Sequence, residues 1–313
     1  MPVVLFVLLA IVFLIFVSGA FTFCMACVRS REMPWLDDAA LSKTAYGKYS
    51  KCIHIADNFL REHNATEVSI QSSDGLQLAG TWLAAENPRG TIILAHGYRS
   101  TKYVDFSLIL EFYHNYGLNI LLPDQRSHGR SEGKIITFGV KESDDIARWV
   151  EWHNTEQGQI PVVLSGLSMG ASTVLYLADA NLPNNVKCII ADCGFTSPWE
   201  IISCVFRRVT HLPAAPSLWA AEGFARVFGG FSLRQKDTRK ILAKSRLPVL
   251  MIHGTDDGFV PCEMTRRGYA ACTGEKQILL VEGADHGLSF VVDGERYRET
   301  VAAFLNDNFG GRI

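Results

Sequence analysis

The sequence lacks the motifs by which many proteins hold metals, nucleotides or nucleic acids. Its 313 residues contain no glycine-rich phosphate-binding loop, no paired Cys-x-x-Cys spacing and no His-Glu-x-x-His. The net charge is −2, and the basic residues are scattered along the chain rather than clustered. We therefore expect no nucleic-acid partner, no metal and no cofactor.

A disulfide framework is also absent, although the chain has eight cysteines. They are too few for a disulfide-rich scaffold of this length, and most lie in apolar segments, which favours buried thiols. Cys24 and Cys27 form a Cys-x-x-Cys without a second pair or a nearby histidine. A metal or redox site is not expected there, and reversible acylation at a membrane boundary is the alternative. The other cysteines are Cys52, Cys188, Cys193, Cys204, Cys262 and Cys272.

Charged side chains are missing from residues 1–28, where Leu, Val, Ile and Phe dominate. As a helix this run would be about 40 Å long, enough to cross a bilayer with some tilt. A cleaved signal peptide is the alternative, but no Lys or Arg precedes the run, and it exceeds a usual signal core. We expect a retained, single-pass transmembrane anchor. Positive charges follow it, so the positive-inside rule predicts a cytoplasmic catalytic domain; they are Arg29, Arg31, Lys43, Lys48 and Lys51.

We divide the rest of the chain into a helical connector, residues 29–65, and a catalytic domain, residues 66–313. The domain opens with a predicted hairpin, 67–83, whose turn is Ser73-Asp74-Gly75. Apolar strands then alternate with helices, which predicts an α/β fold with a mostly parallel sheet covered on both faces. The expected strands are 91–95, 119–122, 160–164, 186–191, 248–252 and 277–281, and the expected helices are 108–116, 141–153, 171–178 and 295–308.

One segment, about 196–245, interrupts this alternation. It has no clear strand but is rich in aromatic and aliphatic residues, with prolines at 198, 213 and 216. We interpret it as a short helical cap over the carboxyl ends of the strands. Its apolar residues either pack the cap onto the body or line an apolar substrate pocket.

The pattern Gly166-Leu167-Ser168-Met169-Gly170 lies between a predicted strand and a predicted helix. In so tight a turn the two glycines avoid a clash, and Ser168 is presented with its hydroxyl exposed. The helix that follows points unpaired N–H groups at the same place, where a negative charge can develop. Ser168 is therefore the candidate nucleophile.

A serine nucleophile requires a base, and the base requires a carboxylate that fixes its tautomer. His286, in Gly-Ala-Asp-His-Gly beyond the last strand, is the candidate base, whereas His253 is interpreted as structural. Three carboxylates follow strands and could orient the histidine. These are Asp192, Asp256 and Asp257, and their spacing does not choose between them.

From about residue 66 onward the sequence resembles the α/β-hydrolases. The resemblance lies in His96-Gly97, the serine elbow, a His-Gly-x-x-Asp-x-x-Val-Pro that starts at His253, and a late Asp-His-Gly at 285–287. Residues 124–131 and 191–197 are similar to the membrane-anchored bacterial branch near serine aminopeptidase-like and monoacylglycerol-lipase-like hydrolases. This resemblance implies that Asp257 is the acid.

The same resemblance implies an oxyanion hole made by the backbone N–H groups of Tyr98 and Met169. It assigns Asp256 to the turn and Asp192 to the cap hinge. The polar residues of the loop after the second core strand are expected to brace that loop rather than react: Asp124, Arg126, His128 and Ser131.

These features predict a membrane-anchored serine hydrolase that cleaves a carboxylic ester through an acyl-enzyme. The apolar cap and anchor favour a lipid-like or aromatic acyl substrate. An amidase, peptidase or thioesterase would use the same three residues. A non-catalytic membrane protein that uses the fold for binding is the alternative of another class.

Overall fold

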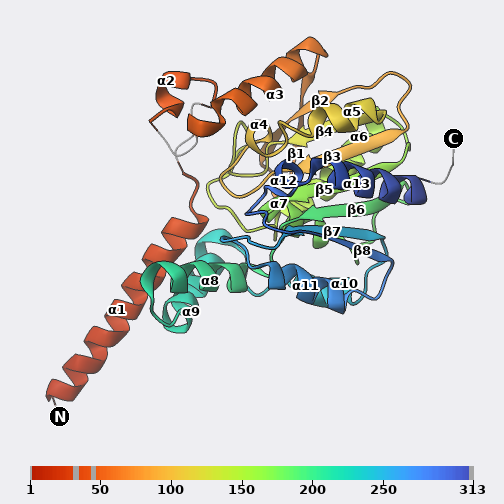
Figure 1. The fold of residues 1–313 in the computed structure, drawn as a ribbon. Helices are drawn as coiled ribbons and strands as arrows, with labels where there is room; N and C mark the ends of the chain where they lie inside the picture. Colours follow the sequence, from red (N-terminus) through yellow and green to blue (C-terminus); the bar gives the residue numbers. More distant parts are fainter. Residues whose placement is uncertain (1, 31–34, 44–46, 310–313) are drawn as a thin grey trace.

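The computed structural model describes residues 2–30, 35–43 and 47–309, so Arg31, one of the positive charges that follow the predicted anchor, lies outside the described residues. Eight strands form one sheet in the order β1-β2-β4-β3-β5-β6-β7-β8 (Figure 1). β1 and β2 form the expected antiparallel hairpin, β2 pairs antiparallel with β4, and all later pairs are parallel. The strands are β1 (Thr66–Gln71), β2 (Gln77–Leu83), β3 (Gly90–Ala95), β4 (Leu118–Pro123), β5 (Val162–Leu167), β6 (Val186–Asp192), β7 (Val249–Gly254) and β8 (Lys276–Val281).

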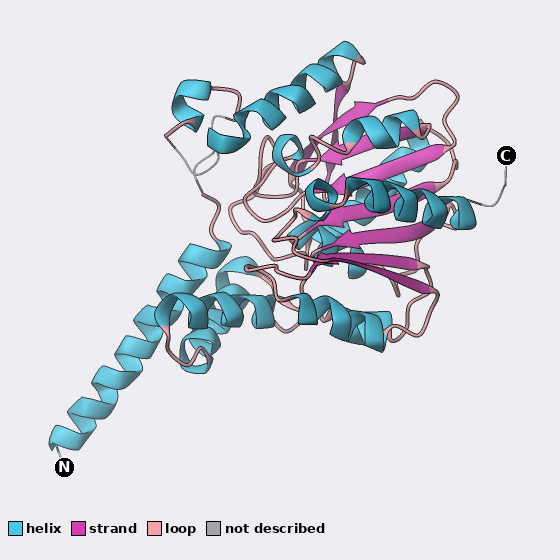
Figure 2. Cartoon of the chain, in the orientation of Figure 1, coloured by secondary structure: helices cyan, strands magenta, loops and turns pink. Residues whose placement is uncertain are grey.

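Helices cover both faces of this sheet (Figure 2). Successive strand residues point to opposite faces, so Ile92 joins one buried cluster and Ile93 the other. The first cluster includes residues of α3 (Ser50–Glu62), α5 (Leu110–Asn115) and α13 (Gly294–Asn308). The second includes residues of α6 (Glu142–Glu156), α7 (Met169–Leu175), α10 (Thr238–Leu242) and α11 (Cys262–Ala271). The predicted α/β class and the two-faced covering are confirmed.

Helix ends differ from the predictions by a few residues. The helix expected at 108–116 corresponds to the shorter α5, and a further short helix that was not predicted, α4 (Lys102–Asp105), precedes it. α4 begins where the Thr101 hydroxyl accepts a hydrogen bond from the Tyr103 N–H at 3.3 Å. The helix after the elbow begins at Met169 rather than Ala171, because the turn takes up fewer residues than expected.

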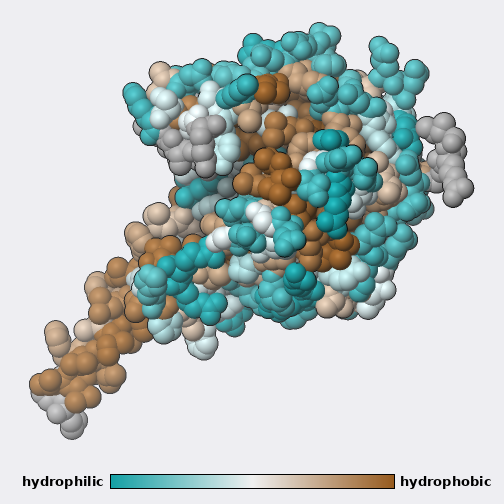
Figure 3. Space-filling view, viewed as in Figure 1, coloured by the Kyte–Doolittle hydropathy of each residue, from teal (hydrophilic) through white to brown (hydrophobic). Residues whose placement is uncertain are grey.

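The N-terminal helix α1 (Pro2–Cys27) projects from the body (Figure 1). Among the described residues it is the helix that is long and apolar enough to cross a membrane, and Figure 3 shows its apolar surface. Its end is fixed to the body, because the Ile136 N–H donates to the Cys27 carbonyl at 2.6 Å and Arg29 donates to the carbonyls of Gly129 and Ser131. The connector that follows contains α2 (Asp38–Leu41), η1 (Gly47–Tyr49) and α3.

The segment expected as a cap contains α8 (Pro198–Thr210), α9 (Ala215–Phe224) and the π-helical turn η2 (Ala225–Gly229), followed by α10. α8 and α9 lie beside α1 in Figure 1. Their buried residues join a third apolar cluster with Phe23 and Cys27 of α1 and with Met169, the residue after Ser168. α10 instead packs against α7 and α11 on the face of the sheet.

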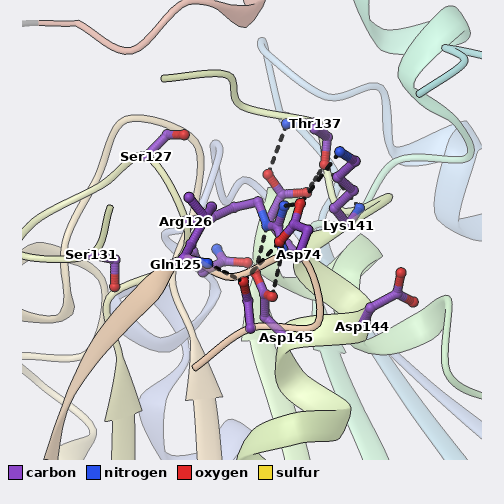
Figure 4. Close-up of polar contacts among 12 residues, drawn as sticks. Asp74, Gln125, Arg126, Ser127, Ser131, Thr137, Lys141, Asp144 and Asp145 are labelled. Carbon is purple, nitrogen blue, oxygen red and sulfur yellow. Dashed lines mark hydrogen bonds and ion pairs between the residues drawn. The ribbon is translucent and has the colours of Figure 1, made fainter. Parts of the chain in front are cut away.

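The loop after β4 is fixed by a buried ion-pair network (Figure 4). The Arg126 guanidinium donates from Nε and Nη2 to the Asp145 carboxylate, both at 2.6 Å, and from Nη1 to Asp74 at 2.9 Å. Burial raises the pKa of Asp145 to about 6, against the lowering effect of Arg126. The network joins the β1–β2 turn, this loop and α6. It braces the loop, in the way that the sequence predicts for Arg126.

We predict that Arg126→Met lowers the free energy of unfolding by about 3–5 kcal/mol, because it leaves the Asp145 carboxylate buried without its partner. The matched control is Arg148→Met, whose pair with Glu151 is exposed and whose loss costs less than about 1 kcal/mol. Thermal unfolding of the full chain in detergent measures both. Equal shifts of the melting temperature would contradict the prediction.

Candidate active site

Ser168 lies at the turn between β5 and α7 in a backbone conformation that few side-chain-bearing residues adopt, with φ of 57° and ψ of −114°. The flanking glycines make this turn possible. A Cβ on Gly170 would lie 1.8 Å from the Ala95 carbonyl oxygen, and a Cβ on Gly166 would lie 2.3 Å from the Gly170 backbone. The Ser168 N–H is held by the Asp192 carbonyl at 2.8 Å. The turn therefore fixes the hydroxyl at the carboxyl end of β5.

The structure brings three of the predicted residues together at this edge of the sheet. The His286 ring has Nε2 2.9 Å from Ser168 Oγ and Nδ1 2.7 Å from Asp257 Oδ2. His286 follows β8 and Asp257 follows β7, so both arrive on loops after strands. The Ser168 residue is 5% exposed and the His286 side chain 23% exposed, and the Phe259 ring lies 5.2 Å from the imidazole.

Asp257 is held as a carboxylate although its side chain is fully buried. Burial opposes its ionisation, but hydrogen bonds from His253, His286 and the Phe259 N–H hold its pKa well below the ordinary value. An ionised carboxylate only accepts hydrogen bonds, so Nδ1 of His286 carries a proton. In the neutral ring Nε2 is then unprotonated and faces the Ser168 hydroxyl as an acceptor.

The other two carboxylates considered from the sequence lie elsewhere. Asp256 is exposed, and its Oδ1 accepts from the Thr255 hydroxyl at 2.9 Å. Asp192 is buried beneath the elbow, where Ser289 Oγ lies 3.4 Å from its Oδ1, and burial raises its pKa. Of the three, Asp257 is the one whose carboxylate contacts the His286 ring.

The loop that contains Tyr98 follows β3 and lies against the elbow, because a Cβ on Gly97 would be 3.4 Å from Ser168 Cβ. Its neighbouring N–H groups are occupied. Gly97 donates to Asp105 Oδ2 at 2.5 Å and Arg99 donates to His128 Nε2 at 3.0 Å. Within the described part of the chain, no hydrogen bond uses the Tyr98 N–H. Met169 lies in the first turn of α7, where helix N–H groups have no intrahelical partner.

Two buried histidines hold this loop in place. His96 Nε2 accepts from the Gln125 N–H at 3.0 Å, and His128 links Arg99 to the Arg126 carbonyl. Burial lowers the pKa of His96 to about 4 and that of His128 to about 3, so both rings are neutral near pH 7. Neutral rings can accept the backbone hydrogen bonds that they receive here.

Sequence reasoning missed Asp105, which is partly buried beside the elbow. It accepts from the Gly97 N–H and, at 2.5 Å, from the Ser100 hydroxyl, while burial raises its pKa to about 6. No strand or glycine motif marks this residue in the sequence. His253, interpreted as structural, contacts the same carboxylate as His286, since its Nε2 lies 3.1 Å from Asp257 Oδ2 and its Nδ1 2.7 Å from Thr265 Oγ1.

Cys193, Asp257 and His286 place one potential metal ligand each within 4.8 Å of one another. Both ring nitrogens of His286 are already used by Ser168 and Asp257. Burial raises the pKa of the Cys193 thiol well above its ordinary value. The arrangement has the geometry of a proton relay.

A cavity of about 240 Å³ lies beside the elbow. Its lining includes Leu167 and Gly287, which are the neighbours of Ser168 and His286 in the chain, and is otherwise largely apolar. No residue of the cap segment contributes to it. The buried apolar residues of the cap pack on the body and on α1. The further lining of the cavity includes Tyr49, Cys52, Leu108, Ile109, Leu288, Phe290 and Val291.

Comparison with known proteins identifies relatives. A family model described as the alpha/beta hydrolase fold matches residues 90–230. The uncharacterized protein YqkD of Bacillus subtilis is 32% identical over 248 residues, which cover 77% of this chain and 79% of YqkD. The uncharacterized membrane protein YNL320W of Saccharomyces cerevisiae is 25% identical, over 76% of this chain and 78% of its own.

Solved structures share the fold. The Pyrococcus furiosus esterase Pf2001 superposes with a TM-score of 0.64 and 24% identity, covering 80% of this chain and 96% of the esterase. The eight-stranded, mostly parallel sheet agrees with these matches. The chain belongs to the α/β-hydrolase superfamily.

Proposed function

We propose that this protein is a serine hydrolase that cleaves a carboxylic ester through an acyl-enzyme. The observation that carries the proposal is the continuous relay from Ser168 Oγ through His286 to the Asp257 carboxylate, with distances of 2.9 and 2.7 Å. Three side chains from separate loops satisfy the geometry that a nucleophile, a base and an orienting acid require.

In the proposed reaction Ser168 Oγ attacks the ester carbonyl carbon while its proton passes to His286 Nε2. The carbonyl oxygen becomes an oxyanion that accepts hydrogen bonds from the N–H groups of Tyr98 and Met169. The bond to the alcohol then breaks, and the alcohol leaves with the proton from His286. Water, deprotonated by His286, attacks the acyl carbon. The bond between the acyl group and Ser168 Oγ then breaks as His286 returns the proton to Oγ, and the acid is released. Asp257 keeps the ring oriented and stabilises its charged form.

The apolar cavity beside the elbow supports an ester with an alkyl or aromatic group, because its lining begins next to both Ser168 and His286. An ester is favoured over an amide because an alcohol leaving group needs less help from the general acid. The Pyrococcus furiosus structure that shares the fold is named as an esterase.

We further propose that α1 is a retained, single-pass membrane anchor rather than a cleaved leader. Its last turns are part of the folded core, since Phe23 and Cys27 are buried with cap residues and with Met169. Tyr98 donates its hydroxyl to the Ala26 carbonyl at 2.8 Å, so the loop of the proposed oxyanion hole rests on the end of α1. The positive charges after α1 support a cytoplasmic catalytic domain under the positive-inside rule.

We predict that a fluorophosphonate probe labels the purified full chain and that Ser168→Ala abolishes the label, because the probe reacts with an activated serine. Ser73→Ala, an exposed serine in the hairpin turn, is the matched control and keeps full labelling. In-gel fluorescence measures both. A folded wild-type protein that does not label would favour a non-catalytic binding role.

We predict that Asp257→Asn lowers kcat for p-nitrophenyl esters by roughly 10³–10⁴-fold, since the amide fixes the wrong tautomer of His286. Asp256→Asn serves as the control because its exposed side chain does not reach the histidine, and kcat is expected to change little. Initial rates of the two variants provide the comparison. A larger loss in Asp256→Asn would overturn the assignment of the acid.

Asp105 makes stability depend on pH, because its pKa in the folded protein, about 6, is above the ordinary 3.8. The folded state then holds this proton at higher pH than the unfolded state does. The contribution of Asp105 to the free energy of unfolding is therefore highest below pH 4. It falls between about pH 4 and 6 and remains low at higher pH.

Asp105→Asn removes this titration. We predict that the variant becomes more stable relative to the wild type as the pH rises from 4 to 7, which is seen as a growing difference between their melting temperatures. The corresponding change in the free energy of unfolding is at most about 3 kcal/mol. Asp307→Asn, an exposed carboxylate on α13, is the control with a flat difference. A flat difference for Asp105→Asn as well would contradict the assigned burial of its charge.

A further inference from the structure

The helix α9 packs along the second half of α1 through small and aromatic side chains. Ser18 Oγ lies 2.7 Å from Ser217 Oγ, and a Cβ on Gly19 would lie only 2.2 Å from Ala220 Cβ. The small residues thus let the two helices approach closely, as in pairs of membrane helices. Further along, the Phe224 ring lies 5.0 Å from Phe16, and its centroid is 6.1 Å from that of Phe23.

Apolar side chains in the same part of α1 face away from the protein. Phe21 is 66% and Met25 55% exposed, and no charged residue occurs in the sequence before Arg29. If α1 lies in a bilayer, acyl chains are needed to cover these side chains. The hydrophobic layer therefore extends along α1 past Ser18 and Gly19, which is the level at which α9 is attached.

The exposed surface of α9 and η2 suits this environment. Trp219, Val227 and Phe228 are exposed by 67%, 75% and 66%. The charged groups of this stretch are Glu222 and Arg226, which pair at 2.6 Å, and Glu222 also accepts from the Leu233 N–H at 2.7 Å. The side of α9 and η2 that faces away from α1 and the body is therefore largely apolar and exposed, which is typical of a helix at a membrane surface.

The neighbouring end of α8 has the composition of a membrane boundary. Val209 and Leu212 are exposed by 72% and 60%, and the adjacent Arg207 and Arg208 are exposed as well. Basic side chains beside apolar ones suit anionic headgroups above an acyl layer. Figures 1 and 3 show α8 and α9 on the side of the body from which the apolar α1 projects.

We propose that α9, η2 and the end of α8 insert into the boundary between headgroups and acyl chains of the leaflet next to the catalytic domain. The cap and α1 then form one membrane-bound unit, and the occupant of the exposed apolar face is lipid. The proposal rests on the membrane insertion of α1 proposed above, and it does not depend on the hydrolytic reaction.

The test uses the full chain in phospholipid nanodiscs with the photo-crosslinking amino acid p-benzoylphenylalanine in place of Trp219 or, separately, Val227. Ile11, which is 48% exposed on α1, is the matched positive control, and the exposed Glu299 on α13 is the negative control. Variants are compared after their melting temperatures match that of the wild type. Two cap positions are used so that one poorly folded variant does not decide the outcome.

After irradiation, intact-mass spectrometry is expected to show the addition of one phospholipid at positions 219, 227 and 11, and none at 299. Lipid addition at position 11 without addition at either cap position would overturn the proposal. Crosslinked protein dimers in place of lipid adducts at the cap would also overturn it, since the face would then bind a second copy. Absence of lipid at position 11 would remove its premise. Each readout is independent of esterase activity, so a failed Ser168 labelling test leaves it interpretable.

Discussion

The structure depends on one constrained turn. Ser168 has a positive φ, and the two glycines around it pass so close to other backbone atoms that any side chain there would overlap them. This close approach brings β5, α7 and the loop after β3 to one point. Because α7 begins at Met169, its free N–H groups face that point as well. The packing of these elements therefore stabilises the strained backbone conformation of Ser168.

The parallel sheet supplies the remaining groups, because the loops after β3, β5, β7 and β8 all leave the same edge. Buried polar residues then fix each loop. His253 supports the Asp257 carboxylate from below, His96 and His128 hold the backbone around Tyr98, and Asp105 accepts from Gly97. These groups have no direct part in the proposed proton transfers. They position the groups that do.

The sequence predicts much of this arrangement, since strand periodicity locates the edge and Ser168 and His286 each follow a strand within a recognisable motif. Only the family resemblance distinguished Asp257 from Asp192 and Asp256 as the acid, because all three lie at or just after the ends of strands. The choice depends on which loop reaches the His286 ring in the folded protein. Asp105 could not be predicted. It is the last residue of a four-residue helix, and its contact with Gly97 exists only once the loop has folded back. The contact of Gly19 with Ala220 could not be predicted either, because small residues in an uncharged apolar run do not indicate which face of the helix packs against protein.

An apolar cluster joins the proposed chemistry to the proposed membrane anchor, since it extends from Phe23 on α1 through the cap to Met169. The central claim remains that Ser168 becomes acylated. Its most direct measurement is rapid quenching of the full chain with a p-nitrophenyl ester, followed by peptide mass spectrometry. We expect the peptide that contains Ser168 to gain the mass of the acyl group as p-nitrophenol is released. Ester turnover without any acylated peptide, or with the acyl group on another residue, would contradict it.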